Sequence, residues 1–285
     1  MRLLIALAVA AALVAAGCGE DEEEPSSQAA ESTPAGPSCE KADLETFADG
    51  TLTVGTDKPA FPPYFVDDDP ANGKGFESAV AYAIGRELGF EQSEVKWTVV
   101  PFNASYRPGP KDFDFDVNQI SITPARAKRV DFSEPYYRAP QAVIATKDSP
   151  AAGATSLAEL KDVTLGVQIG TTSLDAVAAS IQPNAEPKVF DDSNAVVTAL
   201  KQGQVDAAVV DLPTALFLTA VEIPGASVVG QFEAPGGDEW GALLEKDSPL
   251  TPCVNEAIGR LRDSGELDEI TQRWMSESAD APVLQ

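Results

Sequence analysis

Apolar residues follow two different periods along this chain. Residues 51–56 form a short run rich in β-branched side chains, which is typical of a strand. The stretch after it has apolar residues at helical spacing and ends before Gly89; they are Phe76, Ala79, Val80, Ala83, Ile84 and Leu88. Because a strand followed by an amphipathic helix is the repeating unit of α/β proteins, the pattern predicts an α/β fold with mostly parallel sheets.

The same alternation continues towards the end of the chain. Thr123 and Pro124 predict the start of a short helix, since Thr caps a helix and Pro fits its first turn. Further strands are predicted at residues 96–100, 113–117, 141–146, 163–167, 205–210 and 241–244, and helices at 156–160, 171–179, 193–200, 254–261 and 267–274. The middle third therefore contains strand and helix units of its own, enough for a second lobe.

The N-terminus has the features of a secretory signal. Residues 1–17 carry one positive charge and a short apolar run that ends in small residues. This run is shorter than the roughly 20 apolar residues of a membrane-spanning helix. Ala15-Ala16-Gly17-Cys18 resembles the lipobox of bacterial lipoproteins, which implies cleavage before Cys18 and a lipid on its thiol. The alternative is a cleavage site that falls near a cysteine by chance.

The segment after Cys18 lacks the residues of a folded core. Residues 18–40 are rich in Glu, Ser, Pro, Ala and Gly and contain almost no large apolar side chain. Such a segment cannot bury enough surface to offset the entropy lost on ordering. We therefore expect a flexible, lipid-anchored tether that holds the protein at the outer face of the cytoplasmic membrane.

Composition excludes several functions. The chain of 285 residues has a formal net charge of -25 and no histidine. A strongly acidic protein lacks the basic face that nucleic acids require, and the absence of histidine removes the commonest metal ligand and general base. The sequence also contains no Gly-rich phosphate loop, paired-cysteine metal motif or nucleophile elbow. We expect no cofactor, no metal and no nucleic-acid partner.

Two cysteines remain if Cys18 carries lipid. Outside the cytoplasm an even number of cysteines indicates a disulfide, here between Cys39 and Cys253. Two separate buried thiols are the alternative, because nothing in the sequence determines the distance between them. A bridge would attach the start of the folded region to a late helix, and both chain ends would then belong to one lobe.

Three stretches together resemble a known family. They are Gly50 to Asp57 with Pro63-Tyr-Phe, Ser121 to Tyr137, and Gly170-Thr-Thr with Gly203 to Asp211. In this order and spacing they resemble family 3 of the bacterial extracellular solute-binding proteins, the polar amino-acid receptors of ABC transporters. The resemblance implies a type II periplasmic-binding-protein fold, with two Rossmann-like lobes joined by two crossover strands. It assigns residues 41–140 and 233–280 to the first lobe and 141–232 to the second.

The resemblance also implies which residues bind the main-chain groups of an amino acid. Arg126 matches the arginine that holds the α-carboxylate, for which a guanidinium offers a rigid fork of donors. Thr172, with Thr171 at the start of a helix, matches a second contact to that carboxylate. Asp211 matches the partner of the α-ammonium. From the residues alone, Arg126 could be a solvated surface arginine, and Thr171 and Asp211 could be helix caps.

Other residues are expected to surround the ligand. Phe61 matches an aromatic that packs over the ligand side chain, and Ser121 matches a polar contact from the first lobe. Asn118 and Gln119 stand where relatives often carry small residues, so their amides could contact the ligand or replace a water. Two departures from the family, Ala79 and the stretch Asn103 to Pro110, prevent any transfer of ligand identity.

The function implied is that of a monomeric, non-enzymatic receptor. It would bind a polar amino acid between its lobes and deliver it to the permease of an ABC importer. One alternative is a dehydratase-like enzyme on the same fold, which would need a carboxylate such as Glu134 or Asp211 as its acid or base. Another is a sensor lipoprotein that binds its ligand without transporting it.

Overall fold

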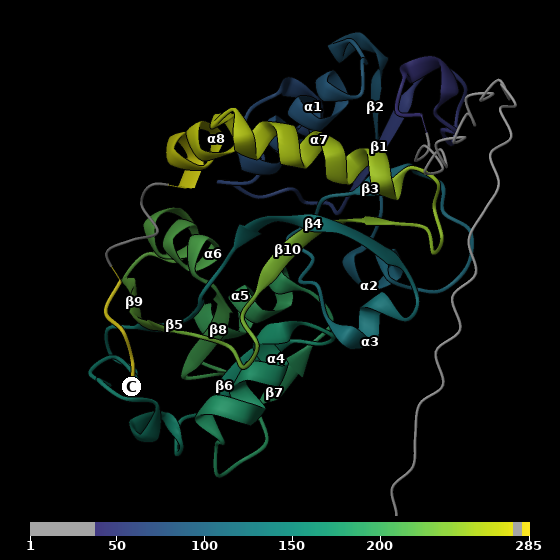
Figure 1. Cartoon of the computed structure of the whole chain (residues 1–285). Coiled ribbons are helices and arrows are strands. Elements are labelled where there is room, and N and C mark those ends of the chain that lie inside the picture. Colours follow the sequence, from purple (N-terminus) through teal and green to yellow (C-terminus); the bar gives the residue numbers. More distant parts are fainter. Residues whose placement is uncertain (1–37, 276–280) are drawn as a thin grey trace, which may run out of the picture. The chain divides into compact units, whose positions relative to one another are not determined.

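The computed structural model describes residues 38–275 and 281–285 (Figure 1). The expected signal peptide at residues 1–17, the lipidation site Cys18 and the tether as far as residue 37 lie outside the described residues. The chain from Pro37 onward forms one compact unit. Within the described ranges, no helix combines the length and the apolar character that crossing a membrane requires.

The first lobe is built on a mixed sheet with the strand order β2-β1-β3-β10-β4. Helix α1 packs on this sheet through an apolar face on which Phe76, Val80 and Ile84 are fully buried. Figure 1 shows α7 and α8 lying along the same lobe. The elements are β1 (Leu52–Thr56), α1 (Phe76–Glu87), β2 (Val95–Val99), α2 (Phe102–Ser105), β3 (Phe115–Asp116), α3 (Pro124–Ala127), β4 (Asp131–Arg138), β10 (Glu239–Leu244), α7 (Thr251–Asp263) and α8 (Glu266–Met275).

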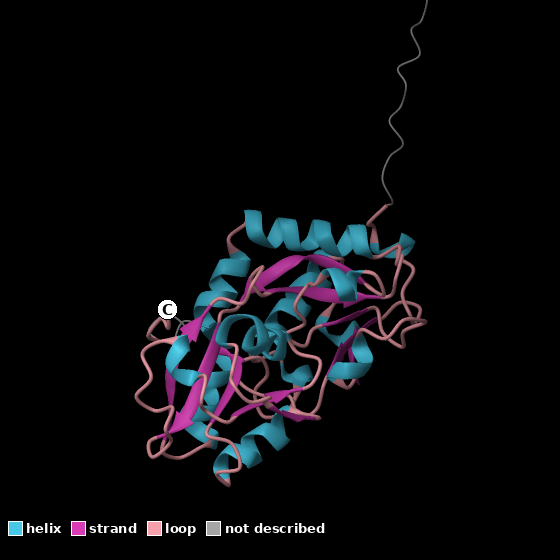
Figure 2. Ribbon diagram, turned by 90° about the horizontal axis from the view of Figure 1, so that it is seen from below, coloured by secondary structure: helices cyan, strands magenta, loops and turns pink. Residues whose placement is uncertain are grey.

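The second lobe is built on a sheet with the order β7-β6-β8-β5-β9. Its central strands are nearly all apolar because helices cover both faces of the sheet. The elements are β5 (Gln141–Thr146), β6 (Leu165–Gln168), α4 (Thr172–Ala176), β7 (Lys188–Phe190), α5 (Ser193–Lys201), β8 (Ala207–Asp211), α6 (Leu212–Phe217) and β9 (Ala226–Phe232). Figure 2 shows the strands and helices of the molecule from below.

The chain crosses between the two sheets at two points in the described region. It leaves the first sheet after β4, enters the second at β5, and returns between β9 and β10. This α/β architecture confirms the predicted fold class. Both sheets are mixed: four strands of each run in the same direction, and one strand, β10 in the first sheet and β5 in the second, runs antiparallel to both of its neighbours. The parallel strands end at the border between the lobes, whereas the strands that follow a crossover begin there.

Several elements escaped the sequence pattern. Strand β4 contains Glu134 and Pro135, which mask its periodicity, and it tolerates proline because it lies at the edge of its sheet. The stretch at residues 101–110 includes the short helix α2, which was not predicted. The strand predicted at residues 113–117 shortens to β3. Strands β7 and β9 and helix α6 were also not predicted.

The two ends of the described chain attach to different lobes. A disulfide joins Cys39 to Cys253 of α7, and Cys39 packs against the core of the first lobe. The last residues instead pair with β9, where Val283 forms a bridge with Gln231, and Leu284 is only 4% exposed within the core of the second lobe. The expectation that both ends belong to one lobe is therefore wrong, because the tail satisfies its backbone groups along an edge strand.

Candidate ligand-binding site

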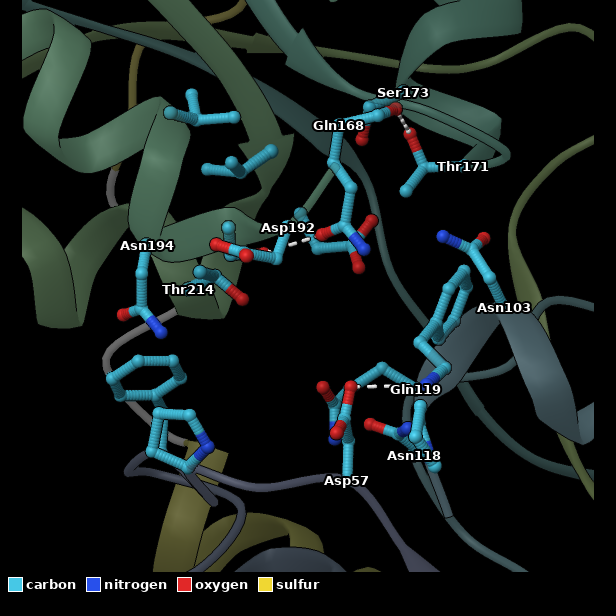
Figure 3. A pocket seen from close by; sticks show the side chains of 18 of the residues that line it. Asp57, Asn103, Asn118, Gln119, Gln168, Thr171, Ser173, Asp192, Asn194 and Thr214 are labelled. Carbon is cyan, nitrogen blue, oxygen red and sulfur yellow. Dashed lines mark hydrogen bonds between the residues drawn. The ribbon is translucent and has the colours of Figure 1, made fainter. Parts of the chain in front are cut away.

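A cavity of about 450 Å³ is lined by residues of both lobes. Asp57 follows β1, Gln168 ends β6 and Asp211 ends β8, so the cavity lies at the carboxyl ends of parallel strands, where open α/β sheets bind their ligands. Figure 3 shows Asp57, Asn118 and Gln119 facing the second-lobe residues Gln168, Asp192 and Thr214 across this space.

Seven of the eight residues expected to bind the ligand line the cavity. They are Phe61, Asn118, Gln119, Ser121, Thr171, Thr172 and Asp211. The hydroxyl oxygens of Ser121 and Thr172 are 3.2 Å apart, so a polar residue expected from the first lobe meets one expected to contact the carboxylate from the second. The hydroxyl of Thr171 has local partners as well, since it donates to the carbonyl of Gln168 and accepts from the N–H of Leu174.

Arg126 lies beside the cavity rather than on its lining. It belongs to α3, which begins as predicted with Thr123 as its cap. Its Nη1 donates to the carbonyl of Ser121 at 2.7 Å, and its Nη2 donates across the lobes to the carbonyl of Gly170 at 2.9 Å. The side chain is only 7% exposed, and this burial lowers the pKa of the guanidinium.

Residues 103–110, where the sequence departs from the pattern of the family it resembles, include side chains that pack around Arg126. The guanidinium packs over the ring of Tyr106 at 4.9 Å, and Tyr106 donates to Oδ1 of Asn103. This pair contacts the turn at Gly170, whose φ is +75°. A Cβ there would lie 2.5 Å from the Tyr106 hydroxyl, so glycine is required both by the backbone and by the approach of the first lobe.

Among the described residues, the side chain of Asp211 accepts a hydrogen bond only from Gln141, which also donates to Asp238. Nε2 of Gln141 lies 2.6 Å from Oδ1 of Asp211 and 2.6 Å from Oδ2 of Asp238. Burial, and next the nearby carboxylate of Asp238, raise the pKa of Asp211 to about 8, although Gln141 and Arg126 act in the opposite direction. In the ligand-free protein Asp211 is therefore largely protonated at neutral pH, and a cation in the cavity would favour its ionised form.

Gln119 is held by an acid that sequence reasoning missed. Glu77 is fully buried in α1 and accepts hydrogen bonds from the backbone N–H of Gln119 at 2.7 Å, from the Gln119 side chain, and from the Tyr136 hydroxyl at 2.5 Å. These bonds support the left-handed backbone of Gln119, whose φ is +49°. Burial raises the pKa of Glu77 to about 7.

Further polar residues that the sequence did not single out line the cavity. Asp57 accepts backbone N–H groups of Lys58 and Phe102, and Asp192 caps α5. Asp57 and Gln168 could have been identified from the sequence, because each stands at the end of a strand. No such signal marks Asn103, Asn194 and Thr214, whose place at the cavity depends on the tertiary fold. Within the described residues, no group of three or more Cys, Asp or Glu side chains is placed to hold a metal ion.

The chain is similar in sequence and in structure to known binding proteins. The L-cystine-binding protein TcyJ of Escherichia coli K12 is 29% identical over 228 residues, covering 79% of this chain and 82% of that protein. The arginine-binding extracellular protein ArtP of Bacillus subtilis is 29% identical over 209 residues, covering 71% and 78%. The solved structure of an ancestral arginine-binding protein bound to arginine has a TM-score of 0.67 and 32% identity, covering 79% of this chain and 98% of that one.

The family model for bacterial extracellular solute-binding proteins, family 3, matches residues 52–277. This range contains both sheets and the lining of the cavity. The resemblance drawn from the three sequence stretches is thereby confirmed, and the chain belongs to family 3 of the bacterial extracellular solute-binding proteins.

Proposed function

We propose that this protein captures a polar α-amino acid in the cavity between its lobes and delivers it to the permease of an ABC importer. The observation that carries the proposal is that an acceptor for an ammonium and donors for a carboxylate lie around one cavity. Asp211 offers an acceptor for an α-ammonium, while the hydroxyls of Ser121 and Thr172, beside the guanidinium of Arg126, offer donors for an α-carboxylate. Membership of the family and the binding proteins named above support the same function.

The hydrogen bonds that Arg126 makes leave some of its donors for the proposed role. A guanidinium has five N–H donors, and two of its nitrogens here donate to the carbonyls of Ser121 and Gly170. The remaining donors can serve a carboxylate that lies beside Ser121 and Thr172. Because Gly170 belongs to the second lobe, the same side chain would hold the ligand and the closed arrangement together.

Ligand capture would act by shifting the population of lobe arrangements. Direct contacts already join the lobes, including the hydroxyls of Tyr64 and Thr214 at 2.8 Å and the rings of Phe61 and Phe217 at 6.2 Å. An amino acid that bridges Arg126 and Asp211 contacts both lobes at once, so it favours the closed arrangement by its differential affinity. The closed form would then be recognised by the permease.

The lining supports a polar ligand side chain. Carboxamides from both lobes surround the cavity, namely Asn103, Asn118, Gln119, Gln168 and Asn194, together with the carboxylate of Asp57. Amides donate and accept hydrogen bonds, so such a wall suits a side chain with hydrogen-bonding groups of its own. An aliphatic side chain would leave these groups without partners.

Secretion and anchoring complete the proposal. The apolar segment at residues 1–17 would direct export, and Cys18 would carry the lipid that holds the monomeric receptor at the outer face of the cytoplasmic membrane. The disulfide between Cys39 and Cys253 is consistent with an oxidising compartment. Of the two acids that a dehydratase-like enzyme could use, Glu134 pairs with Arg262 at 2.9 Å and does not line the cavity, whereas Asp211 does and is assigned here to the α-ammonium. The binding proteins named above favour the binding role.

Isothermal titration calorimetry of the purified full-length protein tests the proposal. We expect saturable binding of at least one L-amino acid from a panel that includes L-arginine, L-cystine, L-glutamine and L-histidine. N-acetyl derivatives, which lack the ammonium, and the corresponding amides, which lack the carboxylate, should bind at least about 100-fold more weakly, because each leaves a buried charged group unpaired. Equal binding of either derivative, or no binding across the panel, would contradict the proposal.

A further inference from the structure

The acid at the proposed ammonium site is connected to both crossovers between the lobes. Gln141 is the first residue of β5, directly after the first crossover, and Asp238 is the last residue before β10, at the end of the second. The side chain of Gln141 has no exposed surface, and Asp238 is 1% exposed. Through Nε2, Gln141 joins Asp238 to Asp211, which lies at the end of β8. We call these three residues the crossover network.

Some buried polar atoms of the crossover network have no hydrogen-bond partner among the described residues. Oε1 of Gln141 and Oδ1 of Asp238 are buried and have no hydrogen-bond partner among the described residues. The indole Nε1 of Trp240, two residues after Asp238, is also buried and has no hydrogen-bond partner among the described residues. Buried polar groups are normally paired, so three unpaired atoms beside the crossovers indicate a region whose hydrogen bonding depends on how the lobes are arranged.

We propose that Gln141 and Asp238 are positioning residues for the ammonium subsite, holding Asp211 towards the cavity and linking its occupancy to the crossovers. This inference rests on the proposed function, because it assumes that Asp211 receives the ammonium of an α-amino acid. Neither residue lines the cavity, so both act through Asp211. The shared donor fixes one oxygen of Asp211 and leaves the other for the ligand.

The charges around Asp211 determine how binding depends on pH. In addition to burial, Asp238 on the second crossover and Glu77 on α1 raise the pKa of Asp211, while Gln141 on β5 and Arg126 on α3 lower it. The pKa of Tyr64, beside α6, is raised by burial and next by Asp211. The free protein holds a proton on Asp211 below about pH 8, and an incoming ammonium must displace it. As the pH drops below about 8, affinity therefore falls by up to about tenfold per unit.

Two substitutions test the inference. Gln141→Leu keeps the volume and removes the donor, and we expect the affinity for whichever of L-arginine, L-glutamine and L-cystine binds to fall by about tenfold or more. Asp238→Asn keeps the shape and removes the carboxylate that raises the pKa of Asp211. We expect the pH at which affinity begins to fall to move down by about one unit. Calorimetric titrations between pH 6 and 8.5 measure both effects.

Glu233→Gln is the matched control, since it makes the same acid-to-amide change on the same crossover at an exposed side chain. Its affinity and pH profile should equal those of the unmodified protein. If Asp238→Asn retains the original pH profile, or Gln141→Leu binds normally, the positioning role is wrong while the receptor function stands. If the unmodified protein binds no amino acid, the proposed function fails first; the carboxyl ¹³C shifts of ligand-free Asp238→Asn then still test whether Asp238 controls Asp211.

Discussion

Two acids flank the cavity, and their surroundings differ: Glu77 is fully buried, whereas Asp211 is partly buried. Glu77 in the first lobe accepts three hydrogen bonds from Gln119 and Tyr136, is fully enclosed and does not line the cavity. Asp211 in the second lobe has one shared donor and faces the cavity. Burial raises both pKa values, to about 7 and about 8. A carboxylate that already has several hydrogen-bond donors within the protein stabilises the fold. A carboxylate at a cavity that has only one donor can still bind a ligand.

The largest expected effect separates the two acids by ligand affinity. Asp211→Asn should weaken binding of the amino acids that bind the unmodified protein by about 100-fold or more, because a charged hydrogen bond to the ammonium is lost. Glu77→Gln should weaken it by less than about tenfold, since Glu77 acts only through Gln119. Calorimetry of both variants at pH 8.5, where Asp211 is mainly ionised, makes the comparison. Equal losses would remove the distinction between the two acids.

The next effect is on the pH dependence of stability in the absence of ligand. The pKa of Glu77 is raised from 4.5 to about 7, so the folded protein holds a proton that the unfolded chain releases in this range. The contribution of Glu77 to the free energy of unfolding is therefore greatest below pH 4.5 and is lost as the pH rises to about 7, by up to about 3 kcal/mol. Urea denaturation at pH 5 and 8 should show a smaller difference for Glu77→Gln than for the unmodified protein. An unchanged difference would show that Glu77 does not titrate in this range.

The smallest expected effect concerns the hydrogen bond that Tyr136 donates to Glu77. Tyr136→Phe removes the hydroxyl that donates to Glu77 and should lower the free energy of unfolding by about 1–2 kcal/mol at pH 8, with a smaller loss at pH 5, where Glu77 is neutral. Ligand affinity should stay within about threefold. Tyr82→Phe is the control, because its hydroxyl donates to a carbonyl in an exposed setting. A loss of the same size at both pH values would contradict ionisation of Glu77.

The sequence predicted much of the fold and seven of the residues that line the cavity. Apolar periodicity located α1, β1, β5 and α7 closely, because their buried faces follow helix and strand periods without interruption. It failed at β4, where Pro135 and charged residues occupy an edge strand. Position at a strand end indicated Asp211, and the Thr-Pro pair indicated the helix that carries Arg126.

The supports of the site could not be predicted in this way. Glu77 is 42 residues from Gln119 in the sequence, and its partner Tyr136 is on an unpredicted strand. Its burial, and hence its raised pKa, depends on packing between α1 and the sheet. No local pattern distinguishes such an acid from the many exposed ones in a chain of net charge -25.

The sequence by itself determined the family, the positions of the strands and helices with uninterrupted apolar periods, and the residue types available at the strand ends, because these follow from local spacing and composition. Only the tertiary structure decided which of those side chains share a hydrogen bond and which carboxylates lose contact with water. Gln141 lies 70 residues from Asp211 and 97 from Asp238, yet one amide nitrogen joins them. Hydrogen bonds and desolvation act over a few ångströms in space, and such distances arise only when the folded chain pairs β5 with β8 and brings the second crossover beside them.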